Sequence, residues 1–256
     1  MFNCLAFAGL TVLVTRPAAQ AKFLSDAIIK QGGKAILFPT LEIQALPDRA
    51  PLLKVMRHLT EYNLAIFVSS NAVKQTVADW PSAHPKQLKI IAIGAGTAKI
   101  LQQHGLPPHI LSPPPFSSEA LLTLPELTNV QGQRILIFCG EKGKALLADT
   151  LQRRGADVIT VPVYRRLRPA PPTTAQCQQW QRQPIDIIIS TSCESLQNLH
   201  DLLITKSDWL KKIPLIVISH HMAHLARDLG FTPYVATKAS DTALLDALKI
   251  WYDNAK

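Results

Sequence analysis

Short polar segments follow several of the apolar runs along this sequence. Small residues and hydroxyls are frequent in them, and predicted helices begin directly after several of them. Hydroxyls and backbone amides at helix N-termini bind carboxylates and phosphates, and in α/β folds such loops gather at the carboxyl ends of the strands. Carboxylates and catalytic bases are almost absent here, which predicts a site for an anionic ligand. The segments are Thr15-Arg16-Pro17, Ser69-Ser70-Asn71, Gly94-Ala95-Gly96-Thr97, Cys139 to Lys142, Ser190-Thr191-Ser192 and Ser219-His220-His221.

One of these segments partly matches a dinucleotide-binding fingerprint. Gly94 and Gly96 follow an apolar run, but Lys99 occupies the position of the third glycine. No acidic residue follows at the distance of about 20 residues at which such folds bind the ribose. A tight strand-to-helix turn is therefore the favoured interpretation.

Metal binding and nucleophilic catalysis find little support in the pattern. His220 and His224 are spaced to share a helix face with His221 beside them, but no third ligand completes a known zinc pattern. Cys139 and Cys193 follow apolar runs, yet neither stands in a nucleophile elbow or near a clear His/Asp partner. Solvated histidines and buried, inert thiols are the favoured interpretations, and no metal is predicted.

An internal repeat in the sequence predicts the strands and helices around several of these segments. Residues 12–42 match residues 135–165 without a gap, at a constant offset of 135 − 12 = 123. Each copy reads as a short apolar strand, an amphipathic helix ended by Gly32 or Gly155, a second strand, and Pro39 or Pro162. This is a βαβ unit, whose crossover is almost always right-handed.

The similarity extends beyond the repeat. Residues 64–69 match 185–189 loosely, and residues 90–93 correspond to 216–218 at an offset of 216 − 91 = 125. Serines before the helices predicted from residues 118 and 241 indicate N-caps. Alternating strands and helices in both halves predict an α/β fold of two similar domains, each with a parallel sheet flanked by helices.

Two extended segments follow the prolines of the repeat. Residues 40–46 end at Pro47 and residues 163–168 end at Pro169. Segments bounded by proline in this way are typical of linkers between packed bodies. We expect both to be extended and solvated, and they are suited to pair with each other.

Composition limits the class of protein and its partners. The 256 residues carry 27 Lys and Arg against 18 Asp and Glu, a net charge of +9, which favours an anionic partner. The basic residues are scattered and no nucleic-acid-binding signature appears, so nucleic acid is not predicted. Cys4, Cys139, Cys177 and Cys193 lack CxxC spacing, which indicates reduced thiols in the cytoplasm. No signal peptide and no run of about 18 apolar residues appear, so no membrane association is expected.

An ordered set of motifs then resembles a known family. LTVLVTRP, FPTLEI, IFVSSNAV, IAIGAGTA, FSSEALL, GADVITVPVYRR and ASDTALLDAL occur in an order and spacing similar to those of the uroporphyrinogen-III synthase family, over essentially the whole chain. The resemblance implies two α/β domains joined by a two-stranded linker, with the active site in the cleft between them. The implied domains are residues 1–38 with 170–256, and residues 48–160. The implied linker is residues 39–47 and 161–169.

The resemblance also implies a reaction. Such an enzyme, a cyclising lyase of haem biosynthesis, converts hydroxymethylbilane, a linear tetrapyrrole with eight carboxylates, into uroporphyrinogen III, losing water and inverting the last pyrrole ring. It needs no cofactor. The surplus of positive charge suits a polyanionic substrate, and the scarcity of acid and base residues suits a substrate that is itself reactive. A monomer is expected, and a two-lobed binding protein for an anionic small molecule is the alternative.

Site residues follow partly from the matched motifs. Tyr164 matches the family's tyrosine and is expected to help the substrate hydroxyl depart; the structural alternative is a ring that merely covers the linker strands. Ser69, Thr97 and Ser190 match the family's substrate-binding hydroxyls. Where the family often has a second threonine this chain has Met222, so a histidine beside it is expected to replace that contact. The remaining expected substrate-binding residues are Arg16, Ser70, Asn71, Gly94, Lys142, Arg165, Ser192, Ser219 and His221.

Overall fold

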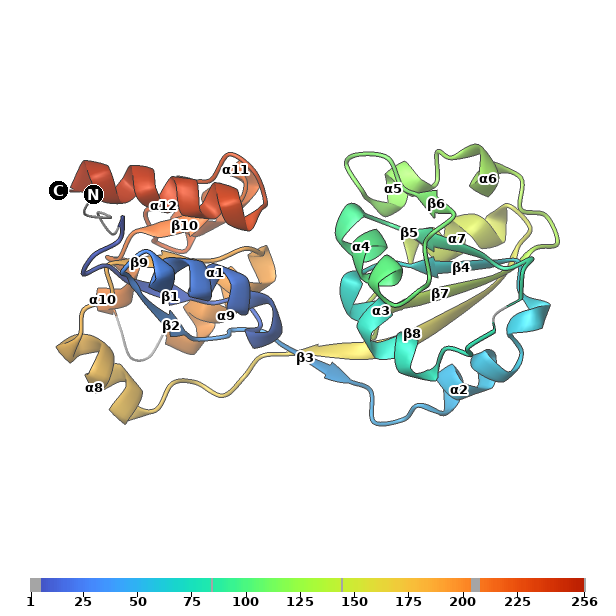
Figure 1. The fold of residues 1–256 in the computed structure, drawn as a ribbon, viewed down its shortest axis with the longest axis horizontal. Helices are drawn as coiled ribbons and strands as arrows, with labels where there is room; N and C mark the ends of the chain where they lie inside the picture. Colours follow the sequence, from blue (N-terminus) through green and yellow to red (C-terminus); the bar gives the residue numbers. More distant parts are fainter. Residues whose placement is uncertain (1–5, 84, 144, 204–207, 256) are drawn as a thin grey trace. The chain divides into compact units, whose positions relative to one another are not determined.

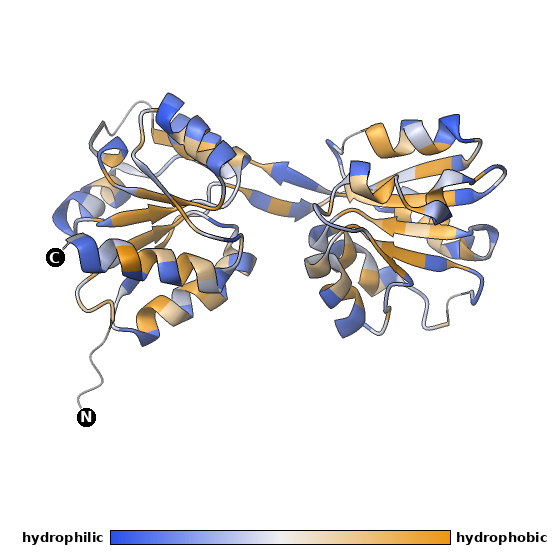
Figure 2. Ribbon diagram, turned by 90° about the horizontal axis from the view of Figure 1, so that it is seen from above, coloured by the Kyte–Doolittle hydropathy of each residue, from blue (hydrophilic) through white to orange (hydrophobic). Residues whose placement is uncertain are grey.

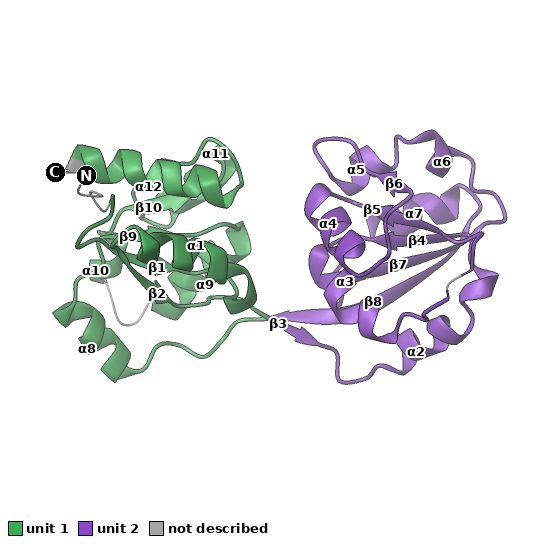
Figure 3. Cartoon of the chain, in the orientation of Figure 1, with its two compact units in different colours: residues 1–42, 167–256 green, residues 43–166 purple. Residues whose placement is uncertain are grey.

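The protein is described by a computed structural model that covers residues 6–83, 85–143, 145–203 and 208–255 (Figure 1). The chain divides into two compact units. Residues 1–42 and 167–256 form unit 1, and residues 43–166 form unit 2 (Figure 3). The chain therefore starts unit 1, builds all of unit 2, and then returns to complete unit 1.

Unit 1 is a five-stranded sheet with helices on both faces. Its strand order is β11-β10-β9-β1-β2, and every adjacent pair is parallel. The strands are β1 Thr11–Val14, β2 Lys34–Leu37, β9 Ile187–Ile189, β10 Leu215–Val217 and β11 Pro233–Val235. The helices are α1 Ala18–Lys30, α8 Thr174–Arg182, α9 Cys193–Leu203, α10 Asp208–Lys211, α11 His220–Asp228 and α12 Asp241–Ala255.

Strand β1 is apolar at every position of its centre because both faces of the sheet are covered. Successive strand side chains point to opposite faces. Val12 and Val14 pack into a core with α1 and α12, whereas Leu13 packs into a second core with α9 and α11. In Figure 2 the strands inside each unit are coloured mainly as hydrophobic, whereas the helices carry both hydrophobic and hydrophilic residues.

Unit 2 is a six-stranded sheet of order β3-β8-β7-β4-β5-β6. Its strands are β3 Glu42–Ala45, β4 Leu64–Phe67, β5 Lys89–Ala92, β6 Ile110–Leu111, β7 Arg134–Gly140 and β8 Asp157–Leu167. Its helices are α2 Ala50–Arg57, α3 Ser70–Thr76, α4 Ala95–Gln103, α5 Ser118–Leu121, α6 Pro125–Thr128 and α7 Leu146–Arg153, with 3-10 turns η1 Leu59–Glu61 and η2 Val77–Asp79. The predicted fold class, two α/β units with parallel sheets flanked by helices, is confirmed.

The internal repeat is also a repeat of strand register. Val12 of β1 lies opposite Ala35 of β2, and Ile135 of β7 lies opposite Val158 of β8. On the other side, Val12 faces Ile187 and Ile135 faces Leu64, and 187 − 64 is again 123. Five strands of unit 2, in the order β8-β7-β4-β5-β6, therefore correspond to β2-β1-β9-β10-β11 of unit 1. The βαβ repeat comes first in unit 1 and last in unit 2.

The segments expected to be solvated linkers are partly buried, so that expectation is wrong. β8 does not stop at Val161 but runs through Pro162 to Leu167, with β3 as its neighbour in the sheet. Pro162 lies opposite Cys139, next to an irregularity of the β7–β8 register between Cys139 and Gly140. Strands tolerate proline near such irregularities. Val163 and Tyr164 pack into the unit 2 core. None of the helices in the described part of the chain is long and apolar enough to cross a membrane.

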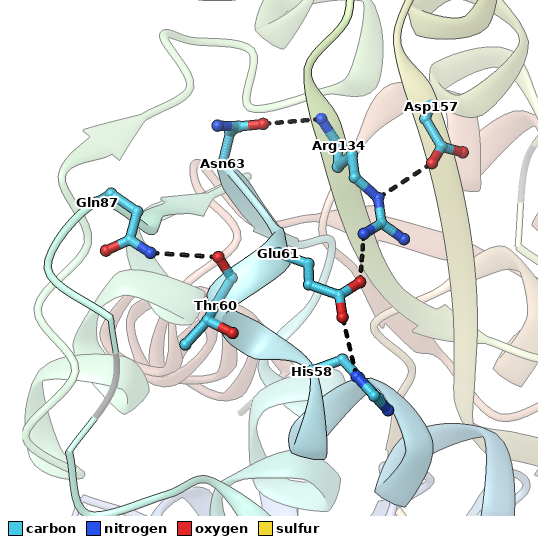
Figure 4. Close-up of polar contacts among 7 residues, drawn as sticks. All are labelled: His58, Thr60, Glu61, Asn63, Gln87, Arg134 and Asp157. Atoms are coloured by element: carbon cyan, nitrogen blue, oxygen red, sulfur yellow. Dashed lines mark hydrogen bonds and ion pairs between the residues drawn. The ribbon is translucent and has the colours of Figure 1, made fainter.

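A network of charged side chains lies at the amino ends of the unit 2 strands (Figure 4). The Arg134 guanidinium donates a hydrogen bond to Asp157 Oδ2 at 3.2 Å and forms an ion pair with Glu61. The other oxygen of Glu61 lies 2.9 Å from His58 Nδ1. Asn63 accepts the backbone N–H of Arg134 at 2.8 Å. These contacts link η1 to β7 and β8 at the amino ends of the strands, opposite to the polar loops at the carboxyl ends.

This network predicts a pH-dependent contribution of Glu61 to stability. The hydrogen bond from Arg134, followed by the contact with His58, lowers the pKa of Glu61 below its ordinary value of 4.5. The stabilisation is therefore fully present above pH 4.5 and is lost as the pH falls through the lowered pKa. We expect Glu61→Gln to lower the melting temperature slightly at about pH 7 and to lower it by less at about pH 3, because the contribution of Glu61 decreases as the pH falls below 4.5. The same difference at both pH values in thermal unfolding would contradict this assignment.

Candidate functional site

Each sheet has a point where the chain leaves adjacent strands in opposite directions. In unit 2 this point lies between β7, which continues to β8, and β4, which continues to β5; in unit 1 it lies between β1 and β9. Ligands of doubly wound α/β folds bind outside the carboxyl ends of the strands at such a point. The loops predicted to bind a ligand begin there: residues 69–71 and 139–142 in unit 2, and residues 15–17 and 190–192 in unit 1.

Tyr164 places its phenol at the switch point of unit 2, the place where the chain leaves β7 and β4 in opposite directions. It lies on β8 opposite Gly140, just past the irregularity in the ladder, and only 2% of its surface is exposed. Ser69 Oγ donates a hydrogen bond to Tyr164 Oη at 3.2 Å. Ser69 also accepts the N–H of Ala72 at 3.1 Å, which caps α3 and fixes the direction of the serine side chain. Because the phenol oxygen is the acceptor, its own proton is available for a further acceptor.

Gly140 makes room for this ring. A Cβ built on Gly140 would lie 2.9 Å from Tyr164 Cζ and 3.2 Å from Tyr164 Oη. The N–H of Glu141 donates to the carbonyl of Tyr164 at 2.8 Å, which holds the two chain segments together at this point. Gly140 was not singled out from the sequence. The requirement for glycine at this position depends on the strand register that places Tyr164 opposite it.

The loop after β5 lies beside Ser70. Gly94 is the N-cap of α4, and a Cβ on Gly96 would lie 3.5 Å from Ser70 Oγ. Thr97 is buried in the first turn of α4, while Ser70 and Asn71 are half-buried at the start of α3. α4 starts directly after β5 and Gly94, as expected of a tight strand-to-helix turn. Unit 2 thus brings Ser69, Ser70, Gly96 and Tyr164 together.

Two predicted basic residues of unit 2 differ in environment. Lys142 is exposed in the turn after β7. Arg165 is half-buried, and its Nη2 donates to Gln44 Oε1 of β3 at 3.3 Å. Arg165 Nε is buried without a hydrogen-bond partner among the residues that the structure describes. Lys142 is therefore the more accessible charge for a ligand.

Cysteine chemistry is disfavoured by the environment of the thiols. Burial raises the pKa of Cys139 to about 11, so its thiol stays protonated at neutral pH. Cys177 is also buried and free, whereas Cys193 is half-buried rather than buried as expected. Cys4 lies outside the described residues.

Arg16 is less available to a ligand than the sequence suggested. Its side chain is 12% exposed, and it forms an ion pair with Asp241 at the start of α12. Its Nε donates to Thr191 Oγ1 at 3.1 Å. Arg16 therefore joins the loops after β1 and β9 to α12. No feature of the local sequence identifies Asp241, 225 residues away, as its partner.

Hydroxyl groups line the switch point of unit 1. Thr40 Oγ1 lies 2.6 Å from Ser195 Oγ, and Ser195 Oγ donates to the carbonyl of Thr15 at 3.2 Å. All three side chains are buried. Ser190 Oγ is also buried, without a partner among the described residues. The cluster of Thr15, Thr40 and Ser195 was not predicted, because it joins segments that are distant in the sequence.

The other predicted hydroxyls of unit 1 cap helices. Ser192 accepts the N–H of Ser195 at 3.0 Å, and Ser219 accepts that of Met222 at 3.2 Å. Met222 is buried in a core with Ala223 and Ala226, so its side chain faces the core instead of a ligand. His221, next to it, is exposed, as are His220 and His224. No group of three potential metal ligands occurs among the described residues.

Comparison with known proteins assigns the chain to a family. The family model described as uroporphyrinogen-III synthase HemD matches residues 22–246. The uroporphyrinogen-III synthase of Salmonella typhimurium is 34% identical, and the alignment covers 94% of this chain and 100% of that protein. The enzyme of Escherichia coli is 33% identical with the same coverage. This chain belongs to the uroporphyrinogen-III synthase family.

Solved structures of the uroporphyrinogen-III synthase family share the fold. A mutant uroporphyrinogen III synthase from Thermus thermophilus aligns with a TM-score of 0.63 at 18% identity, covering 96% of this chain and 99% of that one. The uroporphyrinogen-III synthetase from Helicobacter pylori gives a TM-score of 0.59 at 18% identity, covering 94% and 99%. At this identity the similarity concerns the fold alone.

The close approach of Gly140 to Tyr164 predicts a specific coupling in stability. We expect Gly140→Ala to lower the free energy of unfolding by about 1–3 kcal/mol, as overpacking in a core typically does. The loss is expected to be much smaller in a Tyr164→Leu background, where the ring atoms are absent. Denaturant unfolding of the two single variants and the double variant measures this coupling.

Gly96→Ala is the matched control, because its Cβ would make only an ordinary contact with Ser70 Oγ at 3.5 Å. It is expected to cause no loss of stability, since alanine is favoured over glycine in a helix. Equal losses from Gly140→Ala with and without the Tyr164 ring would contradict the proposed contact.

Proposed function

We propose that this protein is a uroporphyrinogen-III synthase, which cyclises hydroxymethylbilane to uroporphyrinogen III with loss of water and inversion of the last pyrrole ring. The observation that carries the proposal is the hydrogen-bonded pair of Ser69 and Tyr164 at the strand ends of unit 2, in a chain of this family. Tyr164 is the catalytic residue. The reaction needs no cofactor, because the substrate is activated by losing its own hydroxyl group.

The first step breaks the bond between the terminal carbon and its hydroxyl oxygen. The nitrogen of the pyrrole that bears this carbon supplies the electrons, and its proton passes to the departing hydroxide, so that water leaves and an azafulvene remains. The phenol of Tyr164 donates a hydrogen bond to the departing oxygen as negative charge develops on it. The hydrogen bond from Ser69 to Tyr164 Oη stabilises the charge that is shifted onto the phenol oxygen, and it holds the ring in place.

The second part of the reaction depends on positioning. The last pyrrole attacks through its substituted carbon to give a spiro intermediate, which fragments and recloses in the inverted sense. Spontaneous closure without inversion gives the type I product. Holding the azafulvene and the attacking carbon in a defined geometry favours the inverted closure.

The eight carboxylates of the substrate are bound by strand-end groups. Backbone amides and hydroxyls at the starts of α3 and α4 suit carboxylates, and Lys142 and Arg165 add positive charge in unit 2. In unit 1, the hydroxyl of Ser190, the caps Ser192 and Ser219, and exposed His221 are the proposed contacts, with Arg16 as an anchoring charge.

We further propose a monomeric enzyme of the cytoplasm that needs no nucleic-acid or membrane partner. The free thiols of Cys139, Cys177 and Cys193 support a reducing compartment.

Removing the Tyr164 hydroxyl tests the catalytic assignment. We expect Tyr164→Phe to lower kcat severalfold to about a hundredfold, with a larger share of type I product, because a hydrogen-bond donor in a water-poor site contributes up to about 3 kcal/mol to the transition state. The melting temperature is expected to change little, since the ring is kept. Product analysis after incubation with enzymatically generated hydroxymethylbilane measures both effects.

Tyr62→Phe is the matched control. Tyr62 is also buried, but it lies under the Arg134 guanidinium at the amino ends of the strands, so its loss of a hydroxyl is expected to leave kcat unchanged. An unchanged kcat in folded Tyr164→Phe would remove Tyr164 from the mechanism.

Charge neutralisation tests the binding assignment. We expect Lys142→Gln and Arg165→Gln each to raise KM, and added salt to raise the KM of the unmodified enzyme, because charges are screened over about 8 Å at physiological ionic strength. Arg16→Gln is expected to lower the melting temperature as well, since it breaks the contacts with Asp241 and Thr191. Lys22→Gln, at an exposed site on α1, is the control. A KM that is independent of salt would contradict electrostatic binding.

A further inference from the structure

A phenylalanine with a left-handed backbone lies in the loop that follows β6. Phe116 has φ 59°, and 44% of its surface is exposed. A residue with a Cβ and a large side chain rarely adopts this conformation, because the Cβ crowds the following carbonyl. Packing in a hydrophobic core does not offset this cost, since Phe116 belongs to none of the cores formed by the described residues.

The surrounding loop holds the strained conformation in place. The N–H of Phe116 donates to the carbonyl of Pro113 at 2.8 Å, closing a turn. Ser112 Oγ lies within hydrogen-bond distance of the carbonyls of Pro113 and Ser117, at 3.3 and 3.4 Å. Ser117 also caps α5 through the N–H of Ala120 at 3.2 Å. The turn, the serine contacts and the cap together fix the backbone on both sides of Phe116.

The loop places Phe116 at the carboxyl end of β5, beside the proposed site. A Cβ on Gly94 would lie 3.5 Å from Phe116 Cβ and 3.9 Å from its Cγ. Gly94 caps α4, and Gly96 of the same turn approaches Ser70. Ser70 follows Ser69, the hydrogen-bond partner of Tyr164. A continuous series of neighbouring groups therefore connects Phe116 to the phenol along the strand ends of unit 2.

We propose that Phe116 is a substrate-binding residue whose exposed ring packs against one pyrrole ring of the tetrapyrrole. The proposal rests on the synthase activity proposed above. Pyrroles are aromatic, and aromatic rings attract one another in offset or edge-to-face geometry. The loop around Phe116 is built of proline and serine and carries no basic residue between positions 112 and 118, so it offers apolar surface instead of charge. Backbone strain maintained at a ligand site is a recognised form of preorganisation.

Substitution by glycine separates a binding role from a structural one. Glycine adopts positive φ without the Cβ penalty, so we expect Phe116→Gly to melt at the same temperature as the unmodified protein or slightly higher. The loss of the ring is expected to raise KM about threefold to tenfold, with a smaller effect on kcat, as the loss of one aromatic contact implies. Phe116→Tyr keeps a ring and is expected to stay within about twofold of the original KM.

Two further variants complete the test. Phe116→Ala removes the ring but keeps the Cβ, so it should share the raised KM and melt below Phe116→Gly. Phe23→Ala removes a 65% exposed phenylalanine from α1 and should leave KM unchanged. A raised KM in Phe116→Gly together with a normal KM in Phe116→Tyr supports the proposal. A normal KM in folded Phe116→Gly, or a marked fall in its melting temperature, overturns it.

The product formed by the unmodified protein distinguishes a failure of this proposal from a failure of the proposed function. Absence of type III product with hydroxymethylbilane would refute the synthase activity itself. Type III product from the unmodified protein, combined with a normal KM in Phe116→Gly, would refute only the role of Phe116.

Discussion

The fold depends on two central strands that are buried on both faces. β1 and β7 send alternate side chains into two separate cores, so each strand is held from both sides and flanked by a parallel neighbour on each edge. This double burial fixes the register of both sheets. It also fixes where the chain leaves in opposite directions, and there the backbone amides and hydroxyls of several loops meet.

The polar groups at the amino ends of the unit 2 strands differ in their contacts from those at the carboxyl ends. At the amino ends, Arg134 is engaged by Glu61 and Asp157, and its guanidinium covers Tyr62. These groups satisfy one another and connect secondary-structure elements. At the carboxyl ends, Ser69 donates to Tyr164, which leaves a phenol proton for another acceptor. Paired charges therefore connect secondary-structure elements at the amino ends, whereas under the proposed function the groups at the carboxyl ends keep hydrogen-bonding capacity for the substrate.

Patterns that repeat along the chain were sufficient to predict most of the strands, though not β6 or β11, and several helices with their caps, though not α8. They also indicated that the two proline-bounded segments are suited to pair, and β3 and β8 are neighbours in the sheet. Most strand ends lie close to the predicted ones. They do not coincide with them, because burial on both faces sets the end of a strand only approximately. Features that depend on contacts between distant residues were missed. Gly140 needs to be glycine only because the ladder places Tyr164 opposite it. Arg16 is anchored by Asp241, 225 residues away. The continuation of β8 through Pro162 needs an irregularity that no local sequence pattern announces.

The repeat shows how the two units differ at equivalent positions. Ser69 corresponds to Ser192, since 192 − 69 is 123, and both serines cap a helix. Tyr164 corresponds to Leu41, since 164 − 41 is also 123, and a leucine has no proton to donate. Gly140, which gives the phenol its space, corresponds to Pro17, next to the anchored Arg16. Under the proposed function, the shared loop arrangement serves binding in both units. Among the described residues, the capacity to assist a leaving hydroxyl is then specific to unit 2, because a donor serine, a phenol and a glycine lie at the same strand ends there and not in unit 1.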